Sequence, residues 1–220
     1  MANKREEFDL VVFDWDGTLM DSTGNIARAL QMSFRVHGLP VPDYYAARYV
    51  IGLSLNEAFQ YLAPGLAMQH VQEMVHTYKA HYQKVANAPV LYEGVTQWLP
   101  RFRKAGYQLA IATGKSRVGL DNVLQHTGLD AYFVTTRTAE ETFSKPHPQM
   151  LDEISTVLSV EKQHIVVIGD TAYDLQMAIN AGCSAVGMSY GAHDISVLQT
   201  YKPLHIFDDF HVLGSWLVPE

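Results

Sequence analysis

The sequence contains a single cysteine, Cys183, and this scarcity limits the covalent cross-links open to the chain. One cysteine cannot form an intramolecular disulfide, and such sparing use of cysteine is typical of proteins in reducing compartments. Cys183 follows a glycine and has no cluster of cationic residues beside it, which favours a buried, unreactive thiol.

Basic residues are also scarce. The chain has 16 Lys and Arg against 23 Asp and Glu, a formal net charge of -7, and no run rich in Lys or Arg. Affinity for the phosphate backbone of a nucleic acid needs a basic face, so a nucleic-acid partner is disfavoured.

Long apolar runs are absent as well. No segment approaches the roughly 20 residues that a membrane-spanning helix needs. Residues 1–9 are charged and lack the apolar stretch of a secretory signal. We therefore expect a soluble cytoplasmic protein without a membrane partner. The sequence leaves open whether it is a monomer or a homodimer.

Apolar residues are plentiful, at 48% of 220 positions, which is enough for one large domain or for a domain with a smaller one. Between residues 24 and 86 the patterns are helical, with no convincing strand. Ile26, Leu30 and Phe34, for example, recur at four-residue spacing on one helix face. Short helices are expected after Asp43 and Ser54, and a long one over 68–86.

Outside this stretch, strand and helix patterns alternate. We expect strands over 10–13, 109–113, 132–135, 165–168 and 185–188, helices over 95–105, 116–126, 148–158 and 172–181, and a strand fragment with a short helix in 206–217. Pro100 is expected to kink or delay its helix. Such alternation implies a mainly parallel sheet covered on both faces. The expected fold is α/β: a Rossmann-like three-layer core of residues 1–19 and 89–220, with an all-helical insertion over 20–88.

Polar residues follow each of the main predicted strands. The four groups are Asp14 and Asp16 before Gly17, Thr113-Gly114-Lys115-Ser116, Lys145-Pro146, and Gly169-Asp170 with Asp174. Parallel strands end at one edge of a sheet, where such folds place their ligands. Carboxylates, a hydroxyl and a lysine at one edge suit phosphoryl transfer with Mg²⁺, which prefers oxygen ligands.

The chain resembles the haloacid dehalogenase-like hydrolase superfamily in four motifs, which are Asp14-Trp15-Asp16-Gly17-Thr18, Thr113, Lys145-Pro146, and Gly169-Asp170 with Asp174. The helical insertion resembles the cap of the branch that holds phosphoglycolate phosphatase and β-phosphoglucomutase. The resemblance implies that Asp14 is the nucleophile that forms an aspartyl-phosphate. It makes Asp16 the general acid and base, and it places Thr113 and Lys145 on the phosphoryl group.

The same resemblance implies a Mg²⁺ site. Asp14 and Asp170 would bind the ion through their carboxylates, Asp16 would bind it through its backbone carbonyl, and Asp174 would support this set of ligands. The implied activity is hydrolysis of a small phosphorylated metabolite, with phosphoglycolate phosphatase as the nearest named activity. A sugar-phosphate mutase would share all of these residues. A different class is a phospho-receiver or a non-catalytic binding module, although receiver domains lack this cap and the Asp-x-Asp-Gly-Thr motif. A dehalogenase would not need the metal carboxylates.

Residues outside the four motifs are candidates for selecting the substrate. Gly114 is expected at the phosphate, and Arg48 and Ser54, with Gly52 and Leu53 between them, are candidates because of their place in the cap. Gly114-Lys115-Ser116 also resembles the end of a nucleotide phosphate loop. That loop needs a glycine where Leu109 stands, so we reject this interpretation.

Two residues beside the motifs do not have a settled role. Trp15 lies between the two acids of the first motif, and we expect it to pack in the core rather than to form a wall of the site. His147 follows Lys145-Pro146, and the sequence leaves open whether it is structural or lines the site.

Overall fold

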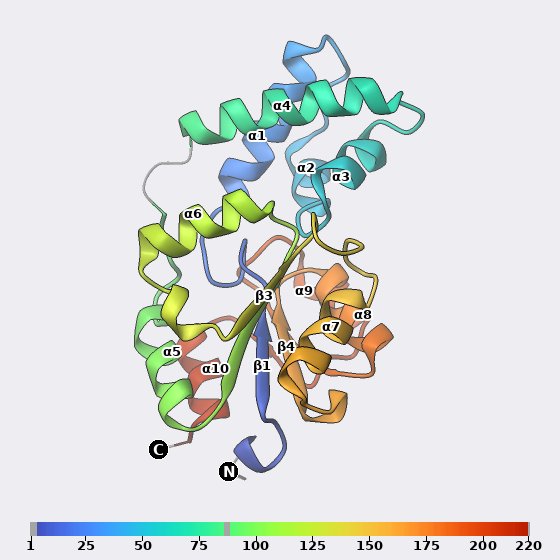
Figure 1. Ribbon diagram of the computed structural model, residues 1–220. Coiled ribbons are helices and arrows are strands. Elements are labelled where there is room, and N and C mark those ends of the chain that lie inside the picture. The colour runs from blue at the N-terminus through green and yellow to red at the C-terminus, as the bar shows by residue number, and fades with distance from the viewer. Residues whose placement is uncertain (1–3, 86–88, 220) are drawn as a thin grey trace.

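The computed structural model describes residues 4–85 and 89–219, and it has a central sheet between helices with four further helices at one end (Figure 1). The sheet has six parallel strands in the order β3-β2-β1-β4-β5-β6. The strands are β1 (Leu10–Phe13), β2 (Gln108–Thr113), β3 (Thr135–Thr138), β4 (Ile165–Gly169), β5 (Ser184–Met188) and β6 (Ile206–Phe207). The expected α/β fold is confirmed.

Strand β1 lies in the middle of the sheet and is buried along its whole length. Val11 and Phe13 face one apolar cluster, whereas Leu10 and Val12 face the other, as the two-residue period of a strand requires. Phe13 is in register with Ile111 of β2 and Ile168 of β4. The residues after these three positions therefore emerge side by side at one edge of the sheet.

Helices cover both faces of the sheet. Apolar residues of α5 (Val95–Lys104), α6 (Arg117–Thr127) and α10 (Phe210–Leu217) belong to the cluster on one face. Those of α7 (Gln149–Leu158), α8 (Ala172–Ala181) and α9 (Ile195–Gln199) belong to the cluster on the other face. Short 3₁₀ helices occur at Lys4–Glu6, Asp130–Tyr132 and Lys162–His164. The parallel strands are thus shielded from water on both sides, which gives three layers.

The segment after β1 forms the four helices at the end of the molecule (Figure 1). They are α1 (Thr23–Val36), α2 (Tyr44–Tyr49), α3 (Leu55–Leu62) and α4 (Met68–Val85). Their apolar faces form a third cluster, in which Phe34 of α1 packs on Phe59 of α3 with the ring centres 5.8 Å apart. The side chains of Asp43 and Ser54 cap α2 and α3 as expected. Residues 86–88, the last of the expected insertion, lie outside the described residues.

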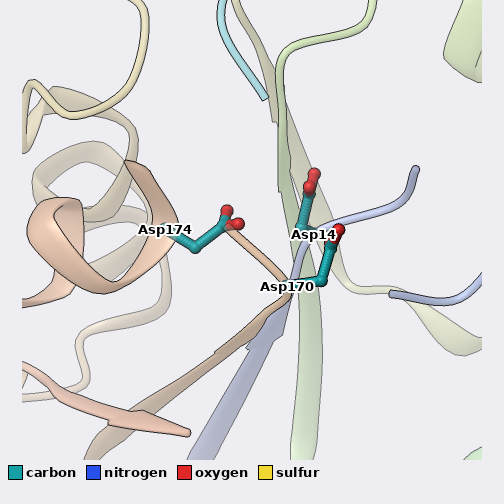
Figure 2. Close-up of side chains that lie close together, drawn as sticks. All are labelled: Asp14, Asp170 and Asp174. Carbon is teal, nitrogen blue, oxygen red and sulfur yellow. The ribbon is translucent and has the colours of Figure 1, made fainter. Parts of the chain in front are cut away.

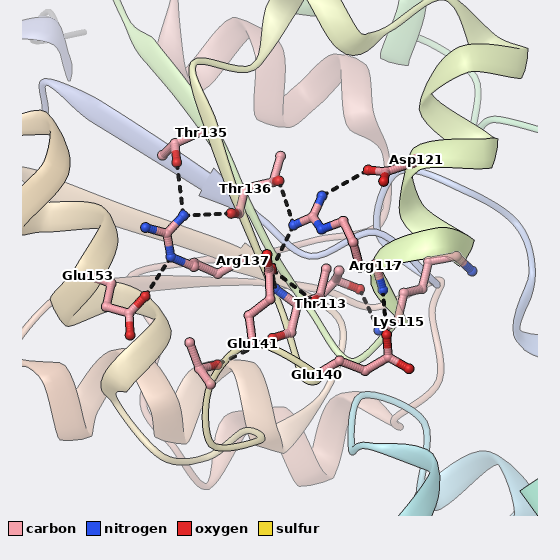
Figure 3. A network of polar contacts seen from close by, with 12 residues as sticks. Thr113, Lys115, Arg117, Asp121, Thr135, Thr136, Arg137, Glu140, Glu141 and Glu153 are labelled. Carbon is pink, nitrogen blue, oxygen red and sulfur yellow. Dashed lines mark hydrogen bonds and ion pairs between the residues drawn. The ribbon is translucent and has the colours of Figure 1, made fainter.

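The third strand lies later in the chain than the prediction of 132–135. Asp130–Tyr132 forms a 3₁₀ turn, and Tyr132 and Phe133 pack against the core from this turn and the residue after it. Strand β3 is the polar sequence Thr-Thr-Arg-Thr at the edge of the sheet. Its side chains are held by hydrogen bonds and ion pairs (Figure 3): Arg137 contacts Glu153 at 2.7 Å, and Arg117 contacts Thr136 at 2.9 Å. The prediction was wrong because the apolar residues that indicated a strand belong to the packed turn, whereas the strand itself is polar.

Two smaller expectations also need correction. Helix α5 begins at Val95, so Pro100 does not delay it, and the helix continues to Lys104. Helix α9 was not predicted, since its five residues are too few for a clear apolar period. No helix among the described residues is long and apolar enough to cross a membrane.

Gly214 of α10 tests the packing of this helix on α5. Alanine in a helix is usually more stable than glycine by roughly 0.5–1 kcal/mol. A Cβ at Gly214, however, would overlap the ring of Trp98. We expect Gly214→Ala to lower the free energy of unfolding by about 1–3 kcal/mol, because overpacking outweighs helix propensity. Urea unfolding measures the change. Ser215→Ala, at the exposed neighbouring position, is the control, and equal stability of both variants would contradict the packing argument.

Candidate active site

Three carboxylates meet at the edge of the sheet where β1 and β4 end (Figure 2). Asp14 follows β1, Asp170 follows β4, and Asp174 lies in the first turn of α8. Oxygen atoms of the three lie within 4.8 Å of one another, and all three residues are at most 2% exposed. The parallel sheet therefore gathers acids from distant parts of the chain into one buried group.

Lys145 supplies a positive charge to this group. Its buried Nζ lies 2.8 Å from Asp14 Oδ1 and 2.5 Å from Asp174 Oδ1. Burial alone would lower the pKa of Lys145, but the charges and hydrogen bonds of Asp14 and Asp174 outweigh it and raise the pKa. Lys145 therefore stays charged. One ammonium faces three carboxylates, so the group retains an excess of negative charge.

Burial and this excess of negative charge raise the pKa values of two of the carboxylates. Burial raises the pKa of Asp14 to about 7, against the opposing effect of Lys145 and with a further rise from Asp174. Burial, Asp14 and Asp174 together raise the pKa of Asp170 well above its ordinary value. Uncompensated carboxylates in a dry site bind a proton or a cation more readily than carboxylates in water.

The hydrogen bonds show which carboxylates are fixed. Asp170 accepts from Thr18 Oγ1 at 2.7 Å and from the backbone N–H of Ala192 at 2.6 Å. Asp174 accepts from the Thr171 backbone at 3.0 Å and from Thr171 Oγ1 at 2.6 Å. Asp14 Oδ1 faces the Lys145 ammonium at 2.8 Å, whereas Asp14 Oδ2 has no hydrogen-bond partner among the described residues. Asp14 thus keeps lone pairs for a metal ion or a substrate.

Gly17 is required where the chain turns behind Asp16. It has a φ of +89°, which side chains rarely adopt, and a Cβ there would overlap the Asp170 carboxylate. The Asp-x-Asp-Gly sequence therefore does two things: it presents the acids, and it lets the backbone pass against the carboxylate of another strand.

Asp16 has different partners from the other acids. Both of its oxygens lie 2.9 Å from Lys115 Nζ, and Ser22 Oγ donates to Oδ1 at 2.6 Å. Its side chain is outside the cluster of three carboxylates and lines a cavity together with Asp14. The sequence analysis missed Lys115. Alternate residues of an extended chain share a side, so the position of Lys115 two residues after Thr113 was a usable signal.

Thr113 and Gly114 lie on the wall of the same cavity. Thr113 is buried, and its hydroxyl accepts from the backbone N–H of Lys115 at 3.3 Å. Gly114 passes directly under the loop between α2 and α3, since a Cβ there would lie 2.6 Å from Gly52 O. Gly52 and Leu53 of this loop also line the cavity.

The structure does not bring Arg48 and Ser54 to the cavity wall. The guanidinium of Arg48 donates to the backbone carbonyl of Gly191. Ser54 caps α3 through its hydroxyl, and its backbone N–H donates to Ser144 Oγ at 2.9 Å. These contacts attach the helical segment to the core. They leave the predicted contact of Arg48 and Ser54 with substrate without a geometric basis.

The structure gives the environments of Trp15 and His147. Trp15 is fully buried in the apolar cluster of the core, as expected. His147 is exposed, and its Nδ1 accepts from the backbone N–H of Gln149 at 3.2 Å. The cavity wall does not include it.

Comparisons with known proteins agree with this geometry. Residues 11–188 match the family described as haloacid dehalogenase-like hydrolase. The chain is 35% identical over 212 residues to "Probable phosphatase IndB" of Dickeya dadantii (strain 3937), covering 94% of this chain and 92% of that protein. It is 28% identical to the phosphoglycolate phosphatase of Vibrio vulnificus (strain YJ016), covering 93% of each. The structure of SP0104 from Streptococcus pneumoniae, a hydrolase of the haloacid dehalogenase-like family, superposes with a TM-score of 0.80 at 23% identity, covering 95% of this chain and 98% of that one.

Gly17→Ala tests the close approach of the backbone to Asp170. The matched control is Gly38→Ala, because Gly38 also has a positive φ, of +67°, but no atom lies within 4 Å of the added Cβ. Both variants bear the cost of a left-handed alanine, about 1–2 kcal/mol. We expect Gly17→Ala to lose at least about 1 kcal/mol more, because the added methyl group displaces a buried carboxylate. Thermal unfolding measures both, and losses of equal size would contradict the proposed overlap.

Proposed function

The chain belongs to the haloacid dehalogenase-like hydrolase family, and on that premise we propose that it is a Mg²⁺-dependent phosphomonoester hydrolase of small phosphorylated metabolites. The observation that carries the proposal is Asp14. It is buried, its Oδ2 has no hydrogen-bond partner among the described residues, and it faces a cavity beside a lysine that remains charged. A carboxylate in this setting is available as a nucleophile.

The residues at the cavity divide the reaction between them. In the first step an oxygen of Asp14 attacks phosphorus, and the bond from phosphorus to the leaving oxygen breaks. Asp16 gives a proton to that oxygen, and in the second step it takes one from the water that releases phosphate. Lys145 and Thr113 stabilise the charge on the phosphoryl oxygens. Lys115 and Ser22 hold the Asp16 carboxylate at the cavity wall.

A divalent metal ion fits the donor set. Asp14 and Asp170, supported by Asp174, would hold it, together with the backbone carbonyl of Asp16. Three buried carboxylates with one ammonium, raised pKa values at Asp14 and Asp170, and the free Oδ2 of Asp14 favour a hard cation. When bound, Mg²⁺ would offset the negative charge of the phosphoryl group and the carboxylates.

We further propose that residues 20–88 act as a cap that selects the substrate. Helices α1 to α4 form an apolar cluster in which Ala192 is the core's buried member, and polar contacts join these helices to the core. One of these is His193 Nε2, 2.8 Å from the Tyr49 carbonyl. The residues 21–24 and 87–91 are the proposed hinges. Residues 87 and 88 lie outside the described residues.

Asp14→Asn is expected to abolish hydrolysis while the fold is retained. The amide keeps the shape of the carboxylate but is a poor nucleophile, so turnover of p-nitrophenyl phosphate should fall at least about a thousandfold. Asp121→Asn, at an exposed carboxylate of α6, is the control. Turnover of the Asp14 variant within about threefold of wild type, roughly 0.7 kcal/mol, would remove Asp14 from the mechanism.

Metal binding is expected to be visible without catalysis. Mg²⁺ added to chelator-treated protein should raise the melting temperature, because a ligand at about 100 times its Kd stabilises by about 2.7 kcal/mol. Asp170→Asn should remove most of this shift, whereas Asp121→Asn should keep it. An equal shift in the Asp170 variant would place the ion elsewhere.

The same protein can be screened against phosphoglycolate, sugar phosphates, nucleotides and pyrophosphate. Phosphoglycolate is included because of the name carried by the Vibrio relative. Release of inorganic phosphate identifies a phosphatase, whereas conversion of a sugar 1-phosphate into its 6-phosphate would identify a mutase.

A further inference from the structure

The cavity beside Asp14 and Asp16 is far larger than a phosphate group needs. Its volume is about 650 Å³, within the range of sites for drug-sized ligands. Phosphoglycolate, with about nine non-hydrogen atoms, is much smaller than such ligands. Most of the space therefore lies beyond the phosphate, where the leaving group of a substrate would be.

The wall of this outer space is mainly apolar. Helix α1 contributes Ile26 and Leu30, the loop between α2 and α3 contributes Ile51 and Leu53, and α4 contributes Tyr78. Ile26, Leu30, Ile51 and Tyr78 are also buried members of the apolar cluster of the cap. An apolar group placed here would leave water for a wall that is already largely shielded from water, which favours binding.

Free positive charge is scarce on the same wall. Among the described lining residues, the lysines are Lys79 and Lys115, and there is no arginine. Lys115 is taken up by both oxygens of Asp16. Lys79 is half exposed and lies 3.6 Å from Glu140. A carboxylate on the leaving group would thus enter a cavity that already contains Asp14 and Asp16, and both described lining lysines already have carboxylate partners.

Arg48, the cap arginine closest in sequence to the loop between α2 and α3, does not add a free positive charge to the cavity wall. Its guanidinium is used by the Gly191 carbonyl and lies 5.8 Å from the centre of the Tyr44 ring. Uncharged hydrogen-bonding groups are present instead, since Gln83 of α4 and Asn122 of α6 line the cavity. Burying an unpaired anion is costly, whereas burying a neutral group beside an amide is not.

We infer that the preferred substrates are phosphomonoesters of bulky, uncharged alcohols with an apolar or aromatic face, and not those of small carboxylate-bearing alcohols such as glycolate. This inference rests on the proposed phosphatase function and narrows its substrate class. The phosphate end meets Asp14, Thr113 and Lys145, and the alcohol is held by the cap. When the phosphorus–oxygen bond breaks, the alkoxide takes its proton from Asp16 and the neutral alcohol leaves through the cavity.

The test compares three esters of primary alcohols at saturating Mg²⁺: 2-phenylethyl phosphate, ethyl phosphate and phosphoglycolate. All three break the same type of bond, so differences report the leaving-group site. We expect kcat/KM for 2-phenylethyl phosphate to exceed both others by at least about tenfold. The product alcohol gives a second readout: 2-phenylethanol should inhibit hydrolysis of p-nitrophenyl phosphate competitively, and glycolate should not.

Leu53→Lys introduces the missing cation into the wall, and Leu53→Met is its matched control. The lysine should reduce the ratio of kcat/KM for 2-phenylethyl phosphate to that for phosphoglycolate by about tenfold, whereas methionine should leave it within about threefold. Melting temperatures establish that both variants fold. Val118→Lys, at a lining side chain that is 68% exposed, repeats the test at a position where folding is not at risk.

The outcomes separate the inference from the proposed function. Phosphoglycolate turned over as well as or better than 2-phenylethyl phosphate would overturn the inference while the phosphatase assignment stands. An unchanged ratio in both lysine variants would also overturn it. If none of the esters is hydrolysed in an Asp14-dependent way, the proposed function fails and the inference fails with it.

Discussion

The excess of buried negative charge at the sheet edge is the constraint on which the rest of the site depends. Lys145 lies between Asp14 and Asp174, but one ammonium cannot balance three carboxylates. Such an arrangement costs free energy in the folded protein unless a proton or a cation completes it. We therefore infer that the group is a binding site. The same excess negative charge that destabilises the group without a ligand gives it affinity for a hard cation and for the phosphoryl group that the cation accompanies.

The fold makes this arrangement possible by holding the acids on rigid elements. β1 and β4 are neighbouring buried strands, so Asp14 and Asp170 leave the sheet side by side. Thr18 and Thr171 then fix Asp170 and Asp174, whereas Asp14 is left without such bonds. The fixed carboxylates supply a constant field, and the remaining one is available to react. A helix-only fold offers no such edge at which distant segments converge.

Sequence reasoning predicted the parts of this design that depend on strong local signals. The buried strand before Asp14, the apolar β4 and the caps of α2 and α3 all follow from hydrophobicity or capping chemistry. It placed β3 wrongly because Thr-Thr-Arg-Thr is stabilised by a hydrogen bond from α6 and an ion pair with α7 (Figure 3), which no local pattern reveals. Lys115 was not predicted as a site residue: its spacing from Thr113 indicates the side of the chain that it shares with Thr113, but not that its partner is Asp16, 99 positions earlier.

Charge and apolar surface are separated across the cavity. The sheet edge contributes Asp14, Asp16 and Lys115, whereas α1, α4 and the loop at Leu53 contribute the apolar residues Ile26, Leu30, Tyr78 and Leu53. Phosphate hydrolysis needs charge that is held in place, but recognition of an uncharged leaving group needs only burial and shape. Because the two requirements are met by different segments, the cap can change its apolar surface without disturbing the buried carboxylates. One contact that joins the segments, between His193 and the Tyr49 carbonyl, lies outside the cavity wall and therefore constrains the position of the cap rather than the chemistry of the site.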